Sequence, residues 1–401
     1  MNNHNTTEAF GTENRKKDTR LWSVASGASA DSESAIREAA AMIEAGGTVA
    51  FPTETVYGLG ADARNTQAVE RIFQAKGRPS DNPLIVHIAD REQLDELVLP
   101  YGETARRLMA RFWPGPLTLV LPARPGAVSP RVTAGLPTVA VRMPAHDVAL
   151  RLIAAAGCPV AAPSANRSGR PSPTLAAHVR EDLAGCIDGI VDGGPTGVGL
   201  ESTVVELIGE RVNVLRPGGV TPAELREVAG EVTLEPALDA ASDTRPEEAV
   251  ARERTGRDGD AVQSRNAPRA DNQTAEPAPR SPGMKYAHYA PRGAMRIVKG
   301  AAPERVSAWI QAELDAARRR GERTGVLAFD EHAGAYRADL VVSCGSLRAL
   351  ETAAQRLYAA LRSFDEHGIG FILAEACPEE GIGLAVMNRL VKAAGHRIVE
   401  V

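Results

Sequence analysis

The apolar positions between residues 47 and 90 predict a strand, a helix and a second strand in close succession. Residues 48–51 form an apolar run with the length of a buried strand, and Pro52 ends it because proline has no N–H to donate to a neighbouring strand. Apolar side chains then recur at helical spacing up to Gly77, a residue suited to the turn after a helix. Residues 84–88 are the second strand. Two strand ends and one helix end could therefore converge on a single pocket.

The same pattern continues to residue 228 with further short elements. Helices are predicted over residues 34–45, 103–113, 148–155 and 222–228, and strands over residues 117–121, 139–141, 160–162, 190–191, 203–208 and 212–215. Many segments between these strands are too short to hold a helix. We therefore expect a twisted mixed sheet surrounded by helices rather than a regular parallel array of βαβ units.

Residues 236–281 interrupt this pattern. The segment has no aromatic residue and no isoleucine, and is rich in alanine, proline and charged residues. Such a sequence cannot bury enough apolar surface to offset the entropy of ordering it, which predicts a flexible linker. From Met295 onward helices and strands alternate to the end of the chain, which predicts a small three-layer, Rossmann-like α/β domain. That domain contains neither GxGxxG nor GxxxxGK[ST], so nucleotide binding by those motifs is not supported.

These observations divide the chain into four regions. We predict a disordered tail over residues 1–20, a catalytic domain over residues 21–230, a flexible linker over residues 231–292 and a C-terminal domain over residues 293–401.

Composition narrows the class of protein. The formal net charge of −5 argues against a global basic surface for nucleic acid, although local basic clusters can still bind phosphates. No run of about 18 apolar residues is present, and residues 1–20 lack the apolar core of a signal peptide. The four cysteines are far apart and form no CxxC pair, so we expect free thiols in a reducing cytoplasm rather than a zinc site.

Basic residues lie at the ends of several predicted elements. Lys76 and Arg78 follow the first helix, where cations are favoured even without a function. Arg142 and Arg216 each lie at the end of a predicted strand. Four cations around one cavity could neutralise a triphosphate and its magnesium without a P-loop.

Six motifs in the first 230 residues, in a fixed order, carry a resemblance to a known family. They are FPTETVYGLG (51–60), KGRPSDNPLIVHI (76–88), TVAVRMP (138–144), APSANRSG (162–169), LESTVV (200–205) and VLRPGGV (214–220). Together they resemble the YrdC/Sua5 family of L-threonylcarbamoyladenylate synthases. SPGMKYAHYAPR (281–292) resembles the linker motif of the longer, two-domain Sua5 branch. The implied fold is a YrdC-like α/β twist around a large concave cavity, followed by a smaller C-terminal domain.

The resemblance also implies roles for individual residues. Lys76 and Arg78 would be the catalytic pair, neutralising charge and positioning the reactants. The residues implied to hold L-threonine are Thr53, His87, Arg142 and Ser202. The residues implied to hold ATP are Arg78, Asn82, Thr138, Ala162, Ser164, Asn166, Arg216 and Tyr289.

Several of these residues have a simpler interpretation from the sequence alone. Thr53 could cap a turn, His87 could be a hydrogen-bonded core histidine, and Ser202 could cap a helix. Tyr286 and Tyr289 could simply anchor the linker on a domain. The family resemblance implies instead that residues 281–292 cover the cavity and that one tyrosine, which we expect to be Tyr289, contacts the nucleotide.

The implied reaction joins L-threonine, bicarbonate and ATP into L-threonylcarbamoyladenylate with release of pyrophosphate. Magnesium would enter with ATP, since no cluster of metal-ligand residues is evident. The product would serve t⁶A formation at position 37 of tRNA through a separate tRNA threonylcarbamoyl transferase complex. Direct tRNA binding is compatible with this function but not required by it.

Two other functions use a similar domain or cavity. A double-stranded RNA or tRNA binding module is disfavoured by the acidic net charge. A carbamoyltransferase of hydrogenase maturation would need zinc-finger modules, which four scattered cysteines do not supply.

Overall fold

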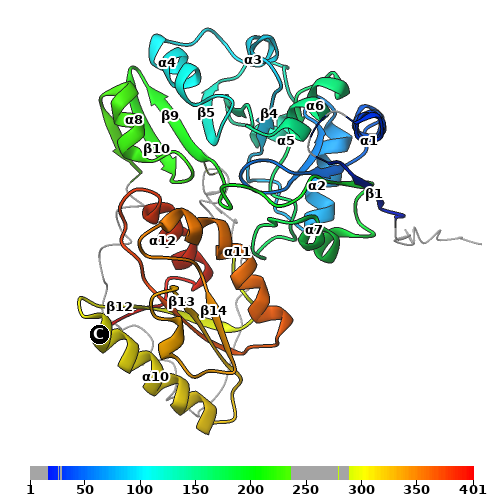
Figure 1. The fold of residues 1–401 in the computed structure, drawn as a ribbon. Helices are drawn as coiled ribbons and strands as arrows, with labels where there is room; N and C mark the ends of the chain where they lie inside the picture. Colours follow the sequence, from blue (N-terminus) through cyan, green and yellow to red (C-terminus); the bar gives the residue numbers. More distant parts are fainter. Residues whose placement is uncertain (1–16, 26, 28, 236–278, 280–288) are drawn as a thin grey trace, which may run out of the picture.

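Two sheets organise the part of the chain that the structure describes (Figure 1). The computed structural model describes residues 17–25, 27, 29–235, 279 and 289–401. Residues 1–16 of the predicted tail, most of the predicted linker and Tyr286 lie outside the described residues. The first sheet has eleven strands and is mixed, and the second has five parallel strands. This confirms the fold class expected from the sequence.

The mixed sheet collects strands from residue 20 to residue 234. In spatial order they are β1 (Arg20–Ser23), β8 (Gly189–Asp192), β2 (Val49–Phe51), β3 (Gly58–Asp62), β7 (Val160–Ala161), β4 (Ile85–His87), β6 (Thr138–Arg142), β5 (Leu117–Pro122), β9 (Thr203–Ile208), β10 (Arg211–Arg216) and β11 (Val232–Leu234). β1 begins one residue before the catalytic domain expected from the sequence, and β11 continues the sheet four residues beyond its expected end.

Helices surround this sheet and connect many of its strands along the chain. They are α1 (Ala30–Glu44), α2 (Thr66–Lys76), α3 (Arg91–Leu97), α4 (Glu103–Phe112), α5 (Pro130–Thr133), α6 (Asp147–Ala156), α7 (Ala176–Leu183) and α8 (Pro222–Ala229). α2 begins and ends at residues that suit the ends of a helix. The Asn65 side chain accepts hydrogen bonds from two N–H groups of the first turn, and Gly77 ends the helix in the left-handed conformation.

One strand beside the cavity was not predicted from the sequence. Gly58 and Gly60 lie in this strand, β3, which pairs with β2 and β7. Packing explains the glycine at position 60, because an added Cβ would lie 2.7 Å from both Phe51 and Val160. A strand therefore needs glycine here for close approach of its neighbours, not for turning.

The parallel sheet forms the core of the second domain. Its order is β14 (Leu340–Ser343), β13 (Thr324–Ala328), β15 (Phe371–Glu375), β12 (Ala294–Lys299) and β16 (Ile398–Glu400). Its helices are α10 (Pro303–Arg319), α11 (Leu350–Glu366) and α12 (Gly383–Ala393), with a short 3₁₀ turn over Ala333–Ala335. Figure 1 shows α11 and α12 on the side that faces the first domain and α10 on the far side.

The two domains share buried apolar surface. The hydrophobic cluster between the parallel sheet and the pair α11 and α12 includes Val56 and Leu200 of the first domain. Gly199 lies directly against α11, since an added Cβ would be 2.4 Å from the carbonyl oxygen of Ala354. Within the described residues, no helix is long and apolar enough to cross a membrane.

Gly199→Ala tests this contact against a matched control. Gly199 and Gly194 both have positive φ, at +82° and +86°, but nothing lies within 4 Å of a Cβ added at Gly194. Both alanine variants therefore carry the left-handed backbone cost, and only Gly199→Ala must also push against α11. We expect its free energy of unfolding, measured in urea, to fall about 1–3 kcal/mol below that of Gly194→Ala. Equal losses would show that the loop does not pack on α11.

Candidate functional site

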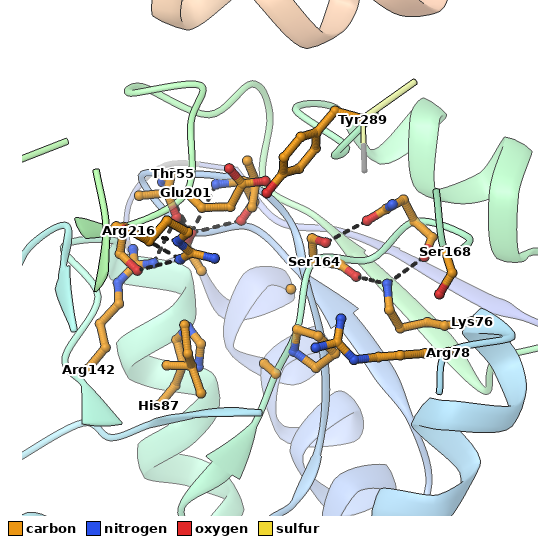
Figure 2. Close-up of a pocket in the computed structure, with 18 of the residues that line it drawn as sticks. Thr55, Lys76, Arg78, His87, Arg142, Ser164, Ser168, Glu201, Arg216 and Tyr289 are labelled. Atoms are coloured by element: carbon orange, nitrogen blue, oxygen red, sulfur yellow. Dashed lines mark hydrogen bonds between the residues drawn. The ribbon is translucent and has the colours of Figure 1, made fainter. Parts of the chain in front are cut away.

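A cavity lies where several strand ends of the mixed sheet meet the second domain (Figure 2). Including its open mouth, it holds about 720 Å³ of space, which is in the range of small-molecule sites. Its walls combine basic, hydroxyl-bearing and apolar side chains. The lining residues are Thr53, Thr55, Val56, Gly58, Lys76, Arg78, Ile85, His87, Arg142, Ala162, Pro163, Ser164, Asn166, Ser168, Gly169, Glu201, Ser202, Arg216 and Tyr289.

Lys76 is the last residue of α2, and its side chain holds the loop that follows β7. Its ammonium donates to the carbonyl oxygens of Ser164 at 2.5 Å and Asn166 at 2.6 Å, and the side chain is buried. Burial, followed by the nearby charge of Arg78, sets the pKa of Lys76 well below its ordinary value. An anionic ligand would favour the ammonium form, so ligand and lysine would stabilise each other in this position.

Ser164 and Asn166 are ordered by the same loop. The Ser164 hydroxyl donates to Oδ1 of Asn166 at 2.6 Å, and the Asn166 amide nitrogen donates to the carbonyls of Arg167 and Arg170. Arg78 extends from the loop after α2 and makes long contacts, of 3.3 and 3.5 Å, to the carbonyls of Pro83 and Asn82. The half-buried Arg78 and the ordered loop thus form one side of the cavity, as Figure 2 shows.

Arg216 lies on the opposite side, at the end of β10. Its guanidinium donates to the carbonyl oxygen of Ser202 at 3.0 Å and reaches the Ser202 hydroxyl at 3.3 Å. That hydroxyl is also 2.7 Å from the hydroxyl of Thr118. Arg216 is buried, and burial is the main reason why its pKa is lowered from the ordinary value. The guanidinium lines the cavity, where an anionic ligand can reach it.

A hydroxyl cluster surrounds Arg142 at the end of β6. Its Nη1 donates to the Thr55 hydroxyl at 2.9 Å, and its Nη2 forms an ion pair with Glu54 at 2.6 Å. Thr53 is buried beside them, with its hydroxyl 2.8 Å from that of Thr55. Both terminal nitrogens of Arg142 therefore have a neighbour in the protein, whereas its Nε has no hydrogen-bond partner among the described residues. The guanidinium can thus still donate to a ligand carboxylate.

His87 lines the cavity on the same side as Arg142, and its ring is uncharged near neutral pH. It lies in the middle of the sheet on β4, 4% exposed, with its ring edge toward Phe51 at a centroid distance of 6.2 Å. Burial, and then the charge of Arg142, lower its pKa to about 3. Among the described residues, its Nδ1 has no hydrogen-bond partner. The ring can therefore exchange a hydrogen bond with a ligand but does not carry a charge near neutral pH.

Two of the residues expected from the sequence do not line the cavity. Asn82 is buried near Arg78, and within the described chain its side-chain amide has no partner. Thr138 begins β6, four residues before Arg142, and so lies roughly 13 Å away along the strand. The other expected residues all line the cavity, including Tyr289 at its upper rim in Figure 2.

The sequence analysis assigned no role to four other residues that line the cavity. Thr55 contacts Arg142, and the N–H of Ser168 donates to the last residue of α2. Val56 joins the hydrophobic cluster between the domains, and Glu201 pairs with Arg389 of the second domain. Thr55 had a visible signal, because it lies three residues after Pro52, at the exit of the predicted strand. Glu201 lies inside the LESTVV motif, but nothing in the sequence indicates its partners in the second domain, which lie more than 150 residues away.

The cavity has no ready set of metal ligands. Among the described residues, no three histidine, cysteine or carboxylate side chains are grouped so that they could hold a metal ion. The two acidic residues nearest the basic groups, Glu54 and Glu201, are each paired with an arginine. Such a site fits magnesium that is bound mainly by phosphates and water, which is a common mode for this ion.

Comparisons with known proteins agree along most of the chain. Residues 41–218 match the family model described as "Telomere recombination" (Sua5_yciO_yrdC), and residues 220–395 match the model described as "Threonylcarbamoyl-AMP synthase, C-terminal domain" (Sua5_C). The chain is 51% identical to the threonylcarbamoyl-AMP synthase of Bacillus subtilis over 91% of its own length and 94% of that protein. It is 47% identical to the one of Pyrococcus abyssi over 91% and 96%.

A solved structure shows the same fold. The crystal structure of P. abyssi Sua5 complexed with L-threonine matches with a TM-score of 0.81 at 45% identity, covering 96% of this chain and all of that one.

The buried His87 predicts a dependence of stability on pH. Its folded-state pKa of about 3 lies below the ordinary value of 6.5, so the unfolded chain binds more protons between these values. Stability from His87 is complete above pH 6.5 and falls by roughly 1.4 kcal/mol per pH unit below it. In urea unfolding, the stability difference between wild type and His87→Gln should shrink by about 2 kcal/mol from pH 7 to pH 5. A difference that stays constant over this range would contradict a buried neutral ring.

Proposed function

This chain belongs to the two-domain Sua5 family of threonylcarbamoyl-AMP synthases, and on that basis we propose how its cavity performs the reaction. The chain is an enzyme that makes L-threonylcarbamoyladenylate, and L-threonine and ATP are its substrates. The observation that carries the arrangement proposed below is the convergence of Lys76, Arg78, Arg142 and Arg216 on one cavity.

We assign the two sides of the cavity to the two substrates. Arg78, the loop held by Lys76, and Arg216 would hold the triphosphate, because a guanidinium or an ordered polar loop can replace the phosphate contacts of a P-loop. The hydroxyl cluster at Thr53, with His87 and Arg142, would hold L-threonine. A P. abyssi Sua5 that is 45% identical has been solved with L-threonine, which supports a threonine site in this fold.

The chemistry proceeds in two bond-forming steps. The amine of threonine adds to carbon dioxide, supplied as bicarbonate, and loses a proton to give a carbamate. A carbamate oxygen then attacks the α-phosphorus of ATP, and the bond from that phosphorus to the bridging oxygen of pyrophosphate breaks. No side chain needs to form a covalent bond. The enzyme lowers the barrier by holding the reactants in line and by offsetting the developing charge on pyrophosphate.

Individual residues then have distinct tasks. Arg78 and Arg216 approach from opposite sides and would stabilise charge on the phosphates as pyrophosphate leaves. Lys76 would keep the carbonyl-rich loop in place and add its own positive charge when phosphate is bound. The neutral His87 would accept or donate a hydrogen bond at threonine without competing for its carboxylate. Magnesium, carried by ATP, would supply further charge neutralisation at the phosphates.

The product carries an activated threonylcarbamoyl group for t⁶A formation at position 37 of tRNA. We propose that a separate tRNA threonylcarbamoyl transferase complex consumes it, because the net charge of −5 argues against a global basic surface for tRNA. Direct tRNA binding is not needed for this scheme.

Arg78→Ala tests the phosphate assignment, because Arg78 is a half-buried cation that lines the cavity. Losing a charge-assisted contact costs roughly 1.5–3 kcal/mol, so threonine- and bicarbonate-dependent release of pyrophosphate should fall about 10- to 150-fold. Lys76→Ala should lose activity similarly and also lower the melting temperature, since it leaves two carbonyls without their donor. Arg111→Ala, in an exposed part of α4, is the control and should retain activity. Normal turnover of Arg78→Ala and Lys76→Ala would refute the assignment.

The side of the cavity that we assign to threonine predicts how well three amino acids serve as substrates. A missing methyl group costs about 1–3 kcal/mol in an apolar pocket, whereas a buried polar group left without its partner costs more. The threonine side of this cavity is rich in hydroxyl groups, so valine should be nearly inert and serine should be a poor substrate. Steady-state kcat/KM for the three amino acids measures this order. Similar values for threonine and valine would contradict the site.

A further inference from the structure

Two fully buried arginines of the second domain reach into the first. Arg362 on α11 donates to a carboxylate oxygen of Asp182 at 2.7 Å and to the carbonyl of Pro171 at 2.6 Å. Arg389 on α12 donates to a carboxylate oxygen of Glu201 at 2.8 Å and to the carbonyl of Pro217 at 3.0 Å. The two contacts are alike in chemistry and burial, since both guanidinium groups are 0% exposed.

The two acidic partners differ in position. Asp182 lies near the end of α7 and does not line the cavity, whereas Glu201 does. The contact of Arg362 therefore joins the domains outside the cavity lining, and Asp182, whose charge acts on Lys76, has Arg170 as a second partner. The contact of Arg389 joins them at the cavity wall, where Figure 2 shows Glu201 between Arg216 and Tyr289.

The second domain supplies most of the donors to Glu201. Tyr358 of α11 donates its hydroxyl to this carboxylate, with distances of 2.7 and 3.0 Å to its two oxygens, and Ser172 of the first domain adds a contact at 2.5 Å. Burial alone would raise the pKa of Glu201, but the charges of Arg389 and Arg216 and these hydrogen bonds outweigh it and lower the pKa to about 2. Glu201 is therefore a buried anion inside a cavity that must accept anionic phosphates.

Arg389 also connects the two segments that carry Ser202 and Arg216. Glu201 immediately precedes Ser202, and Pro217 immediately follows Arg216, so one guanidinium holds both segments. The segments touch at Gly218, where an added Cβ would lie 2.4 Å from the carbonyl oxygen of Glu201. A shift of Arg389 would thus move Ser202 and Arg216 together.

The rim of the cavity depends on the same residues. The ring of Tyr289 is 5.2 Å from that of Tyr358, and the Arg389 guanidinium is 5.5 Å from the Tyr289 ring centre. The second domain therefore contacts the wall of the cavity through Glu201 and its rim through Tyr289.

We propose that Arg389 is a positioning residue of the ATP site, which acts by engaging Glu201 so that this carboxylate neither pairs with Arg216 nor repels the triphosphate. This inference rests on the assignment of ATP to the cavity. Without Arg389, Glu201 would keep its charge next to Arg216, the cation that we assign to phosphate. The second domain thereby becomes part of the synthase, since it supplies the cation that neutralises an acid of the cavity wall.

The test compares Arg389→Met with Arg362→Met and with the double variant Glu201→Gln/Arg389→Met. The Kd for ATP is measured by calorimetric titration, and KM for ATP, KM for threonine and kcat by pyrophosphate release. We expect Arg389→Met to weaken ATP binding at least tenfold with a smaller change in KM for threonine. Arg362→Met should lower the melting temperature comparably but change the ATP constants less than about twofold. The double variant should regain most of the ATP affinity, because it removes the uncompensated carboxylate together with its partner.

The outcomes separate a positioning role from a structural one. Equal effects of Arg389→Met and Arg362→Met on ATP binding, or a double variant no better than Arg389→Met, would overturn the proposal. Arg389→Lys keeps the charge but cannot bind Glu201 and Pro217 with one planar fork, so its Kd for ATP should rise by about three- to tenfold. If Arg389→Met does not fold, Arg389→Lys takes its place in the test. An unchanged Kd of Arg389→Lys for ATP would then overturn the proposal. Absence of pyrophosphate release by the wild type would count against the function itself, whereas the Kd values would still decide the role of Arg389.

Discussion

The buried charges between the two domains are the constraint on which the rest of the structure depends. Removing an ion from water costs several kcal/mol, and only close partners offset that cost. Glu201 has such partners in Arg389 and Tyr358, which come from helices of the second domain. Lys76 and Arg216 are held differently, since they donate to carbonyl and hydroxyl oxygens. Neutral acceptors orient a cation without cancelling its charge, so the cavity keeps positive charge for phosphates.

This arrangement explains how the chain handles ATP without a phosphate-binding loop. A P-loop surrounds phosphates with backbone N–H groups at a helix N-terminus. In the arrangement that we propose here, the phosphate-binding groups would be side chains at strand ends and at the C-terminal end of α2, on opposite sides of one cavity. Separate sides leave room for a second, smaller substrate beside the nucleotide. A site of this kind suits a reaction in which a small amino acid must be activated before it meets the α-phosphate.

The sequence predicted local structure well and long-range contacts poorly. The helix end at Gly77 was predicted correctly because it depends on neighbouring residues only. β3 was missed because its glycines fit against Phe51 and Val160, and such packing leaves no periodic signal. The family motifs indicated nearly all of the cavity residues. They could not indicate the pairing of Glu201 with Arg389, which lie 188 residues apart and meet only when both domains are folded.

The most direct test of the cavity is a crystal structure of the full chain with L-threonine and a non-hydrolysable ATP analogue. Our account predicts the triphosphate between Arg78 and Arg216, beside the loop held by Lys76, and threonine next to Thr53, His87 and Arg142. The threonine amine should face the α-phosphate across a gap that one carbamate group can fill. A nucleotide bound elsewhere, or threonine on the side of Arg78, would contradict the assignment of the two sides.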